Sequence, residues 1–291
     1  MKLSTTVAQE PLEVSILPED RIMVLGSCFA DAMGLRLKAA GFNVCINPFG
    51  TLYNPASIAS AVSRLDSADP FTEKDCVSLG AGDGRVCSFS HHTSFARADI
   101  GEFLLHANKS LSDAAEFWKN CNKVIITLGT AMVWKHLPEQ VVVSNCLKRP
   151  ASEYQHVMLS LDEARNLTAG IVETHRDKSF IFTVSPVRHM SDGAHANTLS
   201  KSVLQLSLCG LPRGCSYFPA YEIVVDELRD YRFYAEDLVH PSNTAYSIVW
   251  ERFLDAAVPV CHHGWVRENE KAARSAAHIT MSNRWGTTPQ V

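Results

Sequence analysis

Three side chains in this sequence have the types that together hydrolyse esters: the hydroxyl of Ser27, the imidazole of His240 and the carboxylate of Asp237. An acid three residues before a histidine, on one turn, can accept a hydrogen bond from the imidazole Nδ1. Nε2 is then free to take a proton from a serine. The pattern therefore predicts Ser27 as the nucleophile, His240 as the general base and Asp237 as the residue that orients the imidazole.

The residues around Ser27 predict the position that such a nucleophile needs. An apolar run at 22–25 leads into Gly26, and apolar residues at helical spacing follow as far as residue 40. This pattern predicts a buried strand, a tight turn and a helix. Ser27 would then lie at the amino end of a helix, where unpaired backbone N–H groups and the helix dipole favour negative charge.

Each of these residues also has a purely structural interpretation. A serine between a strand and a helix is a common N-cap. An acid before a histidine in a turn, as at 237–240, also occurs by chance. Cys28 is an alternative nucleophile, because a helix N-terminus tends to lower the pKa of a thiol. We expect the side chain of Cys28 to point into the core instead.

The remaining elements must bring 237–240 to residue 27. Strands alternate with helices along the chain, which predicts the α/β class, with a parallel sheet covered by helices on both faces. A loop with Gly80, Gly82 and Gly84 suggests a hairpin tip in the stretch 67–101. The strands are expected at 12–16, 21–25, 43–46, 86–89, 123–130, 141–144, 180–184 and 215–218, and the helices at 29–40, 56–65, 110–121, 160–175, 197–208 and 242–257.

The composition is that of an ordinary globular protein, with 46% hydrophobic residues, 20% charged residues and a formal net charge of −4 in 291 residues. We expect one domain over 1–291. Its core would span about 20–258, with 67–101 as a loop-rich insertion over the active face and 266–291 as a loosely attached polar tail.

Several classes of protein are disfavoured by the same composition. There is no basic stripe for nucleic acid and no apolar run that spans a bilayer, so neither partner is expected. Residues 1–15 lack the apolar region of a signal peptide. The nine cysteines are scattered without a Cys-x-x-Cys pair, which predicts no metal site and a reducing, cytoplasmic setting. No cofactor is expected.

Short motifs through most of the chain resemble one protein family. Gly26-Ser27-Cys28-Phe29-Ala30 is similar to the signature that names the GSCFA family. The resemblance covers roughly 20–255, and it implies a place among the SGNH, or GDSL-like, hydrolases. It thereby implies a three-layer α/β/α flavodoxin-like fold and acyl chemistry by a serine. The further motifs that carry it are at 47–50, 53–55, 127–130, 185–189, 217–222 and 230–240.

The resemblance also implies how the oxyanion is bound. Gly50 matches the glycine whose N–H helps to bind the oxyanion, and the N–H of Ser27 would be a second donor. The third donor departs from the family pattern, because Gly129-Thr130-Ala131-Met132 stands where Gly-x-Asn-Asp is usual. The Thr130 hydroxyl or the side chain of Asn145 would have to replace it. One such donor is typically worth about 3 kcal/mol.

Other residues are candidates for binding substrate. Arg188 and His189 end a strand at the presumed active edge and would bind a substrate anion or alcohol, or form a salt bridge and cap. His92, next to His91, would line the mouth, although a solvated loop pair is the commoner arrangement. Trp134 would wall the acyl pocket or belong to the core. Lys201 is expected to be a helix-surface charge, and Tyr221, Tyr231 and Tyr234 to pack around the turn before Asp237.

The sequence thus predicts a hydrolase that cleaves small acyl esters, such as an O-acetyl group on a carbohydrate, through an acyl-enzyme. An O-acyltransferase with the same triad is the first alternative, and the altered third donor is compatible with it. A non-catalytic carbohydrate-binding or scaffolding module on the same fold is the second. The expected partner is a small-molecule ester.

Overall fold

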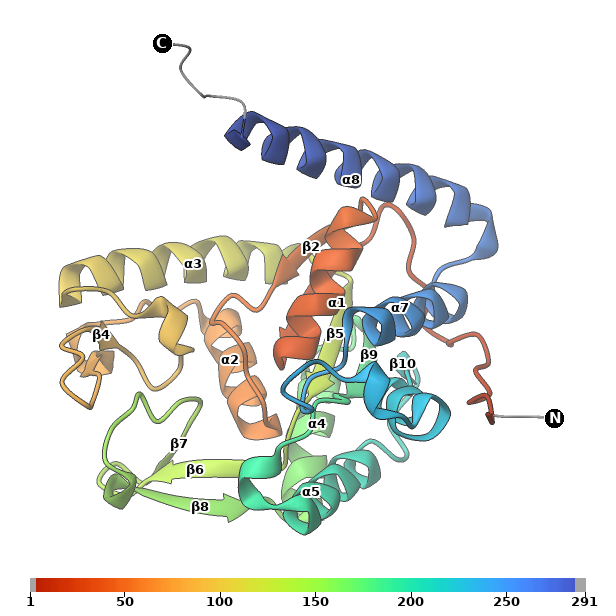
Figure 1. Cartoon of the computed structure of the whole chain (residues 1–291). Coiled ribbons are helices and arrows are strands. Elements are labelled where there is room, and N and C mark those ends of the chain that lie inside the picture. Colours follow the sequence, from red (N-terminus) through yellow and green to blue (C-terminus); the bar gives the residue numbers. More distant parts are fainter. Residues whose placement is uncertain (1–3, 286–291) are drawn as a thin grey trace.

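A five-stranded parallel sheet forms the centre of the computed structural model, which describes residues 4–285 and the side chains of residues 4–276 (Figure 1). Its strand order is β10-β9-β5-β1-β2, and every pair of neighbours is parallel. The predicted fold class is confirmed. The strands are β1 (Arg21–Gly26), β2 (Asn43–Ile46), β5 (Lys123–Leu128), β9 (Ser179–Val184) and β10 (Cys215–Tyr217).

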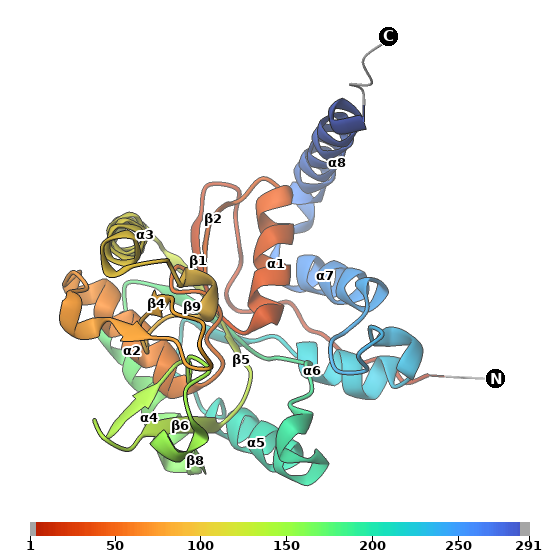
Figure 2. The ribbon, with the colours of Figure 1, turned by 60° about the vertical axis from the view of Figure 1, so that its left-hand side comes forward.

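Helices cover both faces of this sheet and make the three layers that Figure 2 shows. Strand β5 explains why both faces need a cover, because Val124 and Ile126 belong to one hydrophobic core and Ile125 belongs to the other. One face carries α1 (Cys28–Ala39), α6 (Ala220–Glu222) and α7 (Asn243–Ala257). The other carries α2 (Pro55–Ser67), α3 (Ile100–Asn120), α4 (Leu161–Thr174) and α5 (Ala194–Ser207).

A small antiparallel sheet stands beside the carboxyl ends of the central strands. Its order is β7-β6-β8, and its strands are β7 (Val141–Val143), β6 (Met132–His136) and β8 (Tyr154–Met158). Only β7 is predicted from the sequence. β6 and β8 are short and flanked by polar turns, so their pairing with each other, rather than their composition, makes them strands.

Several predicted elements differ from the structure. Residues 12–16 are not a strand, because the N–H groups of Leu12 and Ile16 donate to backbone carbonyls at the end of α7. The Val14 N–H donates to the side chain of Ser216 on β10 rather than to its backbone. α3 begins ten residues before the expected 110, where the Asp99 side chain accepts from the Glu102 N–H. Residues 266–285 of the expected loose tail lie in α8 (His263–Trp285), whose Val266 is buried, and residues 286–291 lie outside the described residues.

α8 begins against the body of the domain and then extends away from it in both views (Figures 1 and 2). Trp250 Nε1 donates to Glu270 at 2.7 Å, and the Trp265 ring meets Phe42 edge-on at 5.1 Å. These contacts fix its first turns. Within residues 4–285, no helix combines the length and the apolar character that crossing a bilayer requires.

The buried face of α5 is largely polar. Leu199 and Leu206 are 42% and 50% exposed, whereas Ser200, Lys201 and Leu204 are buried. The buried face is polar because it packs on the strand ends, whose backbone carbonyls and N–H groups need partners. Simple apolar periodicity therefore selects the opposite side of this helix.

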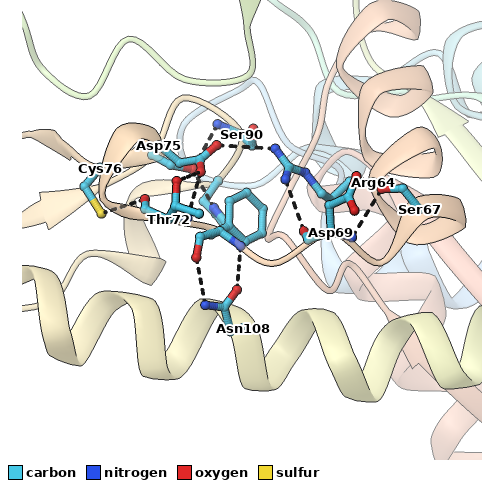
Figure 3. A network of polar contacts seen from close by, with 11 residues as sticks. Arg64, Ser67, Asp69, Thr72, Asp75, Cys76, Ser90 and Asn108 are labelled. Atoms are coloured by element: carbon cyan, nitrogen blue, oxygen red, sulfur yellow. Dashed lines mark hydrogen bonds and ion pairs between the residues drawn. The ribbon is translucent and has the colours of Figure 1, made fainter.

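The stretch 67–101 is attached to α2 and α3 by the polar network in Figure 3. Asn108 on α3 exchanges two hydrogen bonds with the backbone of Phe71, at 2.7 and 2.9 Å. Arg64 on α2 lies over the Phe71 ring and pairs with Asp75 at 3.3 Å. The stretch also carries the short strands β3 (Val77–Ser78) and β4 (Val86–Cys87).

His91, expected in a solvated loop pair, is instead fully buried. Its ring lies among aromatic rings that include Phe71 and Phe103, and its Nδ1 contacts Ser88 Oγ at 2.7 Å. Nε2 has no hydrogen-bond partner among the described residues. Burial lowers the pKa of His91 to about 3, so the ring is neutral in the folded protein.

The end of β1 is held by a close backbone approach. Gly26 has a φ of +141°, and a Cβ at this position would lie 2.2 Å from the carbonyl oxygen of Thr127 on β5. The Gly26 N–H donates to Asn47 Oδ1 at 2.8 Å, and its carbonyl accepts from the Leu52 N–H at 2.8 Å. Only glycine fits this position.

Replacing Gly26 by alanine is expected to lower the free energy of unfolding by about 3 kcal/mol or more, because the new Cβ overlaps backbone rather than a movable side chain. Chemical denaturation measures the change. Gly170→Ala on α4 is the control, since nothing lies within 4 Å of its added Cβ and a helical alanine should stabilise by about 0.5–1 kcal/mol. Equal stability of the two variants would contradict the close approach.

The buried neutral His91 predicts a pH dependence of stability. Its folded pKa is depressed from 6.5, so its contribution is fully present above pH 6.5 and declines as the pH falls and the unfolded state takes up the proton. One such group contributes a slope of up to about 1.4 kcal/mol per pH unit. His91→Phe should reduce the slope of unfolding free energy between pH 6.5 and 5, whereas His195→Gln, at an exposed position, should not. An unchanged slope in His91→Phe would contradict the assignment.

Candidate active site

The carboxyl ends of β1, β5 and β9 meet at one edge of the sheet, as in other open α/β sheets. A cavity of about 720 Å³ lies between this edge and the small sheet β7-β6-β8. Six of the residues predicted for the site line it, together with Cys28: Thr130, Trp134, Asn145, Arg188, His189 and His240. Ser27, Gly50, His92 and Asp237 are not among the lining residues.

Asp237 and His240 form a hydrogen-bonded pair on the loop before α7. Asp237 Oδ2 lies 2.6 Å from His240 Nδ1, and Asp237 Oδ1 accepts the backbone N–H groups of Val239 and His240 at 2.9 and 3.0 Å. These two N–H groups, followed by the imidazole, lower the pKa of Asp237 to about 2. The carboxylate is therefore charged and holds the proton of His240 on Nδ1, which leaves Nε2 as an acceptor.

Ser27 is the N-cap of α1 and is fully buried. Its Oγ accepts from the Phe29 N–H at 3.3 Å, and its own N–H donates to the Thr127 carbonyl at 3.2 Å. The geometry of Ser27 is therefore that of a helix N-cap, as the structural interpretation of this serine predicts. Ser27 is not among the residues that line the cavity to which His240 contributes, so its role as nucleophile stays a prediction.

Cys28 is the first residue of α1 and lines the cavity. Burial raises the pKa of its thiol, and the charge of Asp31 adds to this. The N–H groups of Phe29 and Cys28 oppose the rise, as does Lys201. Burial raises the pKa of Tyr246, and the charges of Cys28 and Asp237 add to the rise.

The proposed oxyanion donors differ in whether they are free. The Gly50 N–H donates to the Asn47 carbonyl at 2.8 Å, and the Ser27 N–H is engaged as described above. Thr130 Oγ1 contacts Ser200 Oγ at 2.9 Å and accepts from the Met132 N–H. Asn145 uses Oδ1 to accept from the Leu147 N–H at 2.8 Å, and among the described residues its amide NH₂ has no hydrogen-bond acceptor.

His92 lies behind the loop that carries Gly50. A Cβ on Gly50, whose φ is +78°, would come within 2.4 Å of the His92 Cβ, so this glycine permits the two chains to touch. His92 Nδ1 contacts Ser94 Oγ at 3.0 Å and caps the turn that follows. The structure therefore places His92 as a support for the Gly50 loop.

Arg188 binds the loop of the acid–base pair at two points. Its backbone N–H donates to the Val239 carbonyl at 3.1 Å, and its Nη1 donates to the Leu238 carbonyl at 3.2 Å. His189, beside it, has its ring edge-on to Tyr53 at 5.8 Å. Burial, then Lys201 and His240, lower the pKa of His189 to about 4, so its ring is neutral.

Lys201, expected on a helix surface, is only 2% exposed. Its Nζ donates to the carbonyls of Gly129 at 2.6 Å and Ser185 at 2.7 Å, and it thereby joins the ends of β5 and β9. Burial lowers its pKa to about 7, against the opposing charge of Cys28. The expectation fails because these two carbonyls need donors that neither strand supplies.

Trp134 on β6 forms one wall of the cavity and is 37% exposed. Its indole stacks on His156 of β8 with 3.8 Å between ring centroids, and His156 Nδ1 lies 3.4 Å from Asp192 Oδ1. Neither His156 nor Asp192 is predicted from the sequence. The position of His156 depends on the β6–β8 register, which pairs it with Trp134.

Comparison with known proteins assigns this chain to a family. The family model described as the GSCFA family matches residues 21–253. The chain belongs to the GSCFA family. No curated protein is similar enough to count as a match. A solved structure from Streptococcus pneumonia, provisionally described as a platelet activating factor, shares 11% identity over 83% of this chain and 85% of that one, with a TM-score of 0.39.

The signature that names the GSCFA family lies at the turn from β1 to α1. It places one residue, Ser27, under the helix as its cap and the next, Cys28, in the cavity. The side chain of Cys28, which the sequence predicts to point into the core, packs in part against a hydrophobic core and also lines this cavity. Among residues 4–276, no group of three or more His, Cys, Asp or Glu side chains is placed to hold a metal ion.

The buried Lys201 makes a test of the strand ends. Lys201→Met keeps the apolar stem and removes the donors to two buried carbonyls, so we expect the free energy of unfolding to fall by about 2 kcal/mol. Lys109→Met on α3, whose side chain is 74% exposed, is the matched control and should change stability little. Lys201→Met with unchanged or higher stability would show that these carbonyls do not depend on the ammonium.

Proposed function

We propose that this GSCFA protein hydrolyses small acyl esters through an acyl-enzyme, with His240 as general base and Cys28 as nucleophile. The observation that carries the proposal is the shared cavity: Cys28 and His240 both line it, and Asp237 holds His240 in the tautomer that accepts a proton on Nε2. This acid–base pair is the one that the sequence predicts. The proposed nucleophile is Cys28 rather than its sequence neighbour Ser27, because Ser27 is buried as the N-cap of α1.

The steps balance with these residues alone. Cys28 Sγ attacks the ester carbonyl carbon, and its proton passes to His240 Nε2. The tetrahedral intermediate then breaks its bond to the alcohol oxygen, which takes the proton from His240 and leaves. Water attacks the thioester, gives a proton to His240 and releases the acid. The proton of His240 finally returns to the thiolate.

The surroundings of Cys28 explain why a base is needed. Its pKa is raised chiefly by burial, so the resting group is a neutral thiol rather than a thiolate. His240 makes the sulfur of Cys28 nucleophilic, because it takes the thiol proton as the sulfur attacks the ester. Two donors are available for the oxyanion: the Cys28 N–H has no backbone acceptor among the described residues, and the Asn145 amide lines the same cavity.

The walls of the cavity indicate which part of the ester lies where. His240 must reach the leaving oxygen, so the alcohol part lies on its side, beside Arg188. The acyl part then lies toward Trp134. A carbohydrate as the alcohol part suits the polar side that His240 and Arg188 form, and a small acyl group suits the indole of Trp134. An O-acyltransferase would follow the same steps, with an alcohol in place of water.

The proposal is tested by turnover of p-nitrophenyl acetate and by mass spectrometry of the acyl-enzyme after a rapid acid quench. Cys28→Ala and His240→Ala should each lower kcat by about 10²-fold or more. Ser27→Ala should keep most of the rate and lose about 1 kcal/mol of stability, as expected for a helix cap. The acetyl group should be found on Cys28.

Two outcomes would change the assignment. An acetyl group on Ser27 that is absent from Ser27→Ala, with Cys28→Ala still active, would return the nucleophile to the serine. Equal rates in the wild type, Cys28→Ala and His240→Ala would contradict an enzymatic role for this cavity. Added alcohols separate transfer from hydrolysis, because a transferase gives ester product beyond what competition with water explains.

A further inference from the structure

A second cavity, of about 290 Å³, lies next to the candidate active site. The two cavities share Val187 and Arg188 in their walls, so Arg188 stands between them. Beside small, apolar and polar residues and the acid Asp230, the second wall contains three tyrosines, a second arginine and a lysine: Tyr221, Tyr231, Tyr234, Arg229 and Lys201. None of the residues predicted as catalytic lines this second cavity.

Both arginines of this wall lack a carboxylate partner within residues 4–276. Arg188 spends one donor on the Leu238 carbonyl, and its guanidinium lies 5.7 Å from the Tyr234 ring centroid and 6.0 Å from that of Tyr231. Arg229 makes no ion pair with a described residue. The acid in the wall, Asp230, is already engaged, because it accepts from the backbone and the guanidinium of Arg232 at 2.9 and 3.0 Å.

The backbone at Arg229 adds a second observation. Arg229 ends the π-helix η5 (Ile223–Leu228) with a φ of +24°. A non-glycine residue with positive φ is strained, and both such strain and π-helical turns concentrate at functional sites. The wide turn of η5 also places Val225 in the cavity wall together with Arg229. Packing alone does not require an arginine at this position.

From these observations we propose that the second cavity binds an anionic group, a carboxylate or a phosphate monoester, on the alcohol part of the substrate. Arg188 and Arg229 would be its ligands, because guanidinium forks bind both groups in bidentate geometry. Tyr231 and Tyr234 would contact the carbon skeleton that carries the anion. The inference rests on the proposed function for its geometry, since the alcohol part lies on the side of His240.

The position of Arg188 links anion binding to the acid–base pair. The loop between Asp237 and His240 contains Leu238, whose φ is +57° and whose carbonyl accepts from Arg188. An anion in the second cavity would accept hydrogen bonds from the same Arg188 guanidinium and hold this side chain from the side opposite to Leu238. The anionic end of the substrate and the general base are therefore positioned by one residue.

The test uses three esters that share an acetylated phenol: phenyl acetate, 4-acetoxybenzoate and 4-acetoxyphenyl phosphate. Wild-type protein should show a higher kcat/KM for at least one anionic ester than for phenyl acetate. Arg229→Gly removes a guanidinium and relieves the strained φ, so it should fold. It should lower the preference for the anionic ester by about 10-fold. Arg213→Ala, at an exposed position that lines neither cavity, is the control and should keep the preference.

Binding is measured separately by calorimetry with 4-hydroxybenzoate and phenyl phosphate, which cannot be hydrolysed at an acyl group. Binding that weakens about 10-fold in Arg229→Gly would support the anion site even if no ester were turned over, and would then count against the proposed function alone. The carboxylate and phosphate arms identify the anion. Neither binding nor a preference for anionic esters, or a preference untouched by Arg229→Gly, would overturn the inference.

Discussion

The contact of Gly26 with the carbonyl of Thr127 is the constraint on which the candidate site depends. It brings the end of β1 against the end of β5 more closely than any side chain allows. Asn47 then accepts from the Gly26 N–H and donates to Asp31 of α1 at 2.6 Å. Three elements are thus fixed to one peptide unit, and the first turn of α1 has a single direction relative to the sheet.

This fixed direction decides which side chain of the signature faces the cavity. Ser27 is turned under the helix, where its Oγ satisfies an N–H of the first turn, and Cys28 at N1 lines the cavity while it also packs against the core. The two roles are complementary, because a helix that presents a reactive group at its N-terminus still needs a cap. Lys201 supports the same arrangement, because its Nζ donates to two carbonyls and so joins the ends of β5 and β9.

The fold was predictable because its strands are continuous apolar runs between helices, as at 123–128 and 179–184, and such local patterns survive in the structure. The pairing of Asp237 with His240 is also local, which is why spacing alone suggests it. The burial of Lys201 and His91 depends on partners far along the chain, such as Gly129 and Phe71. A local pattern of residue types does not predict those contacts, because they form only when distant parts of the chain come together.

The two halves of the candidate site differ in how they are held, and this difference assigns a role to Arg188. Cys28 sits on a rigid helix against the sheet, whereas His240 sits on a loop and its side chain is 44% exposed. A base so placed needs a restraint from outside its own loop. Apart from Asp237 on the same loop, that restraint comes from Arg188, through its backbone and its guanidinium. Arg188 both restrains the loop of His240 and lines the second cavity. In the proposed mechanism it therefore couples the position of His240, the proton acceptor, to the ligand bound in that cavity.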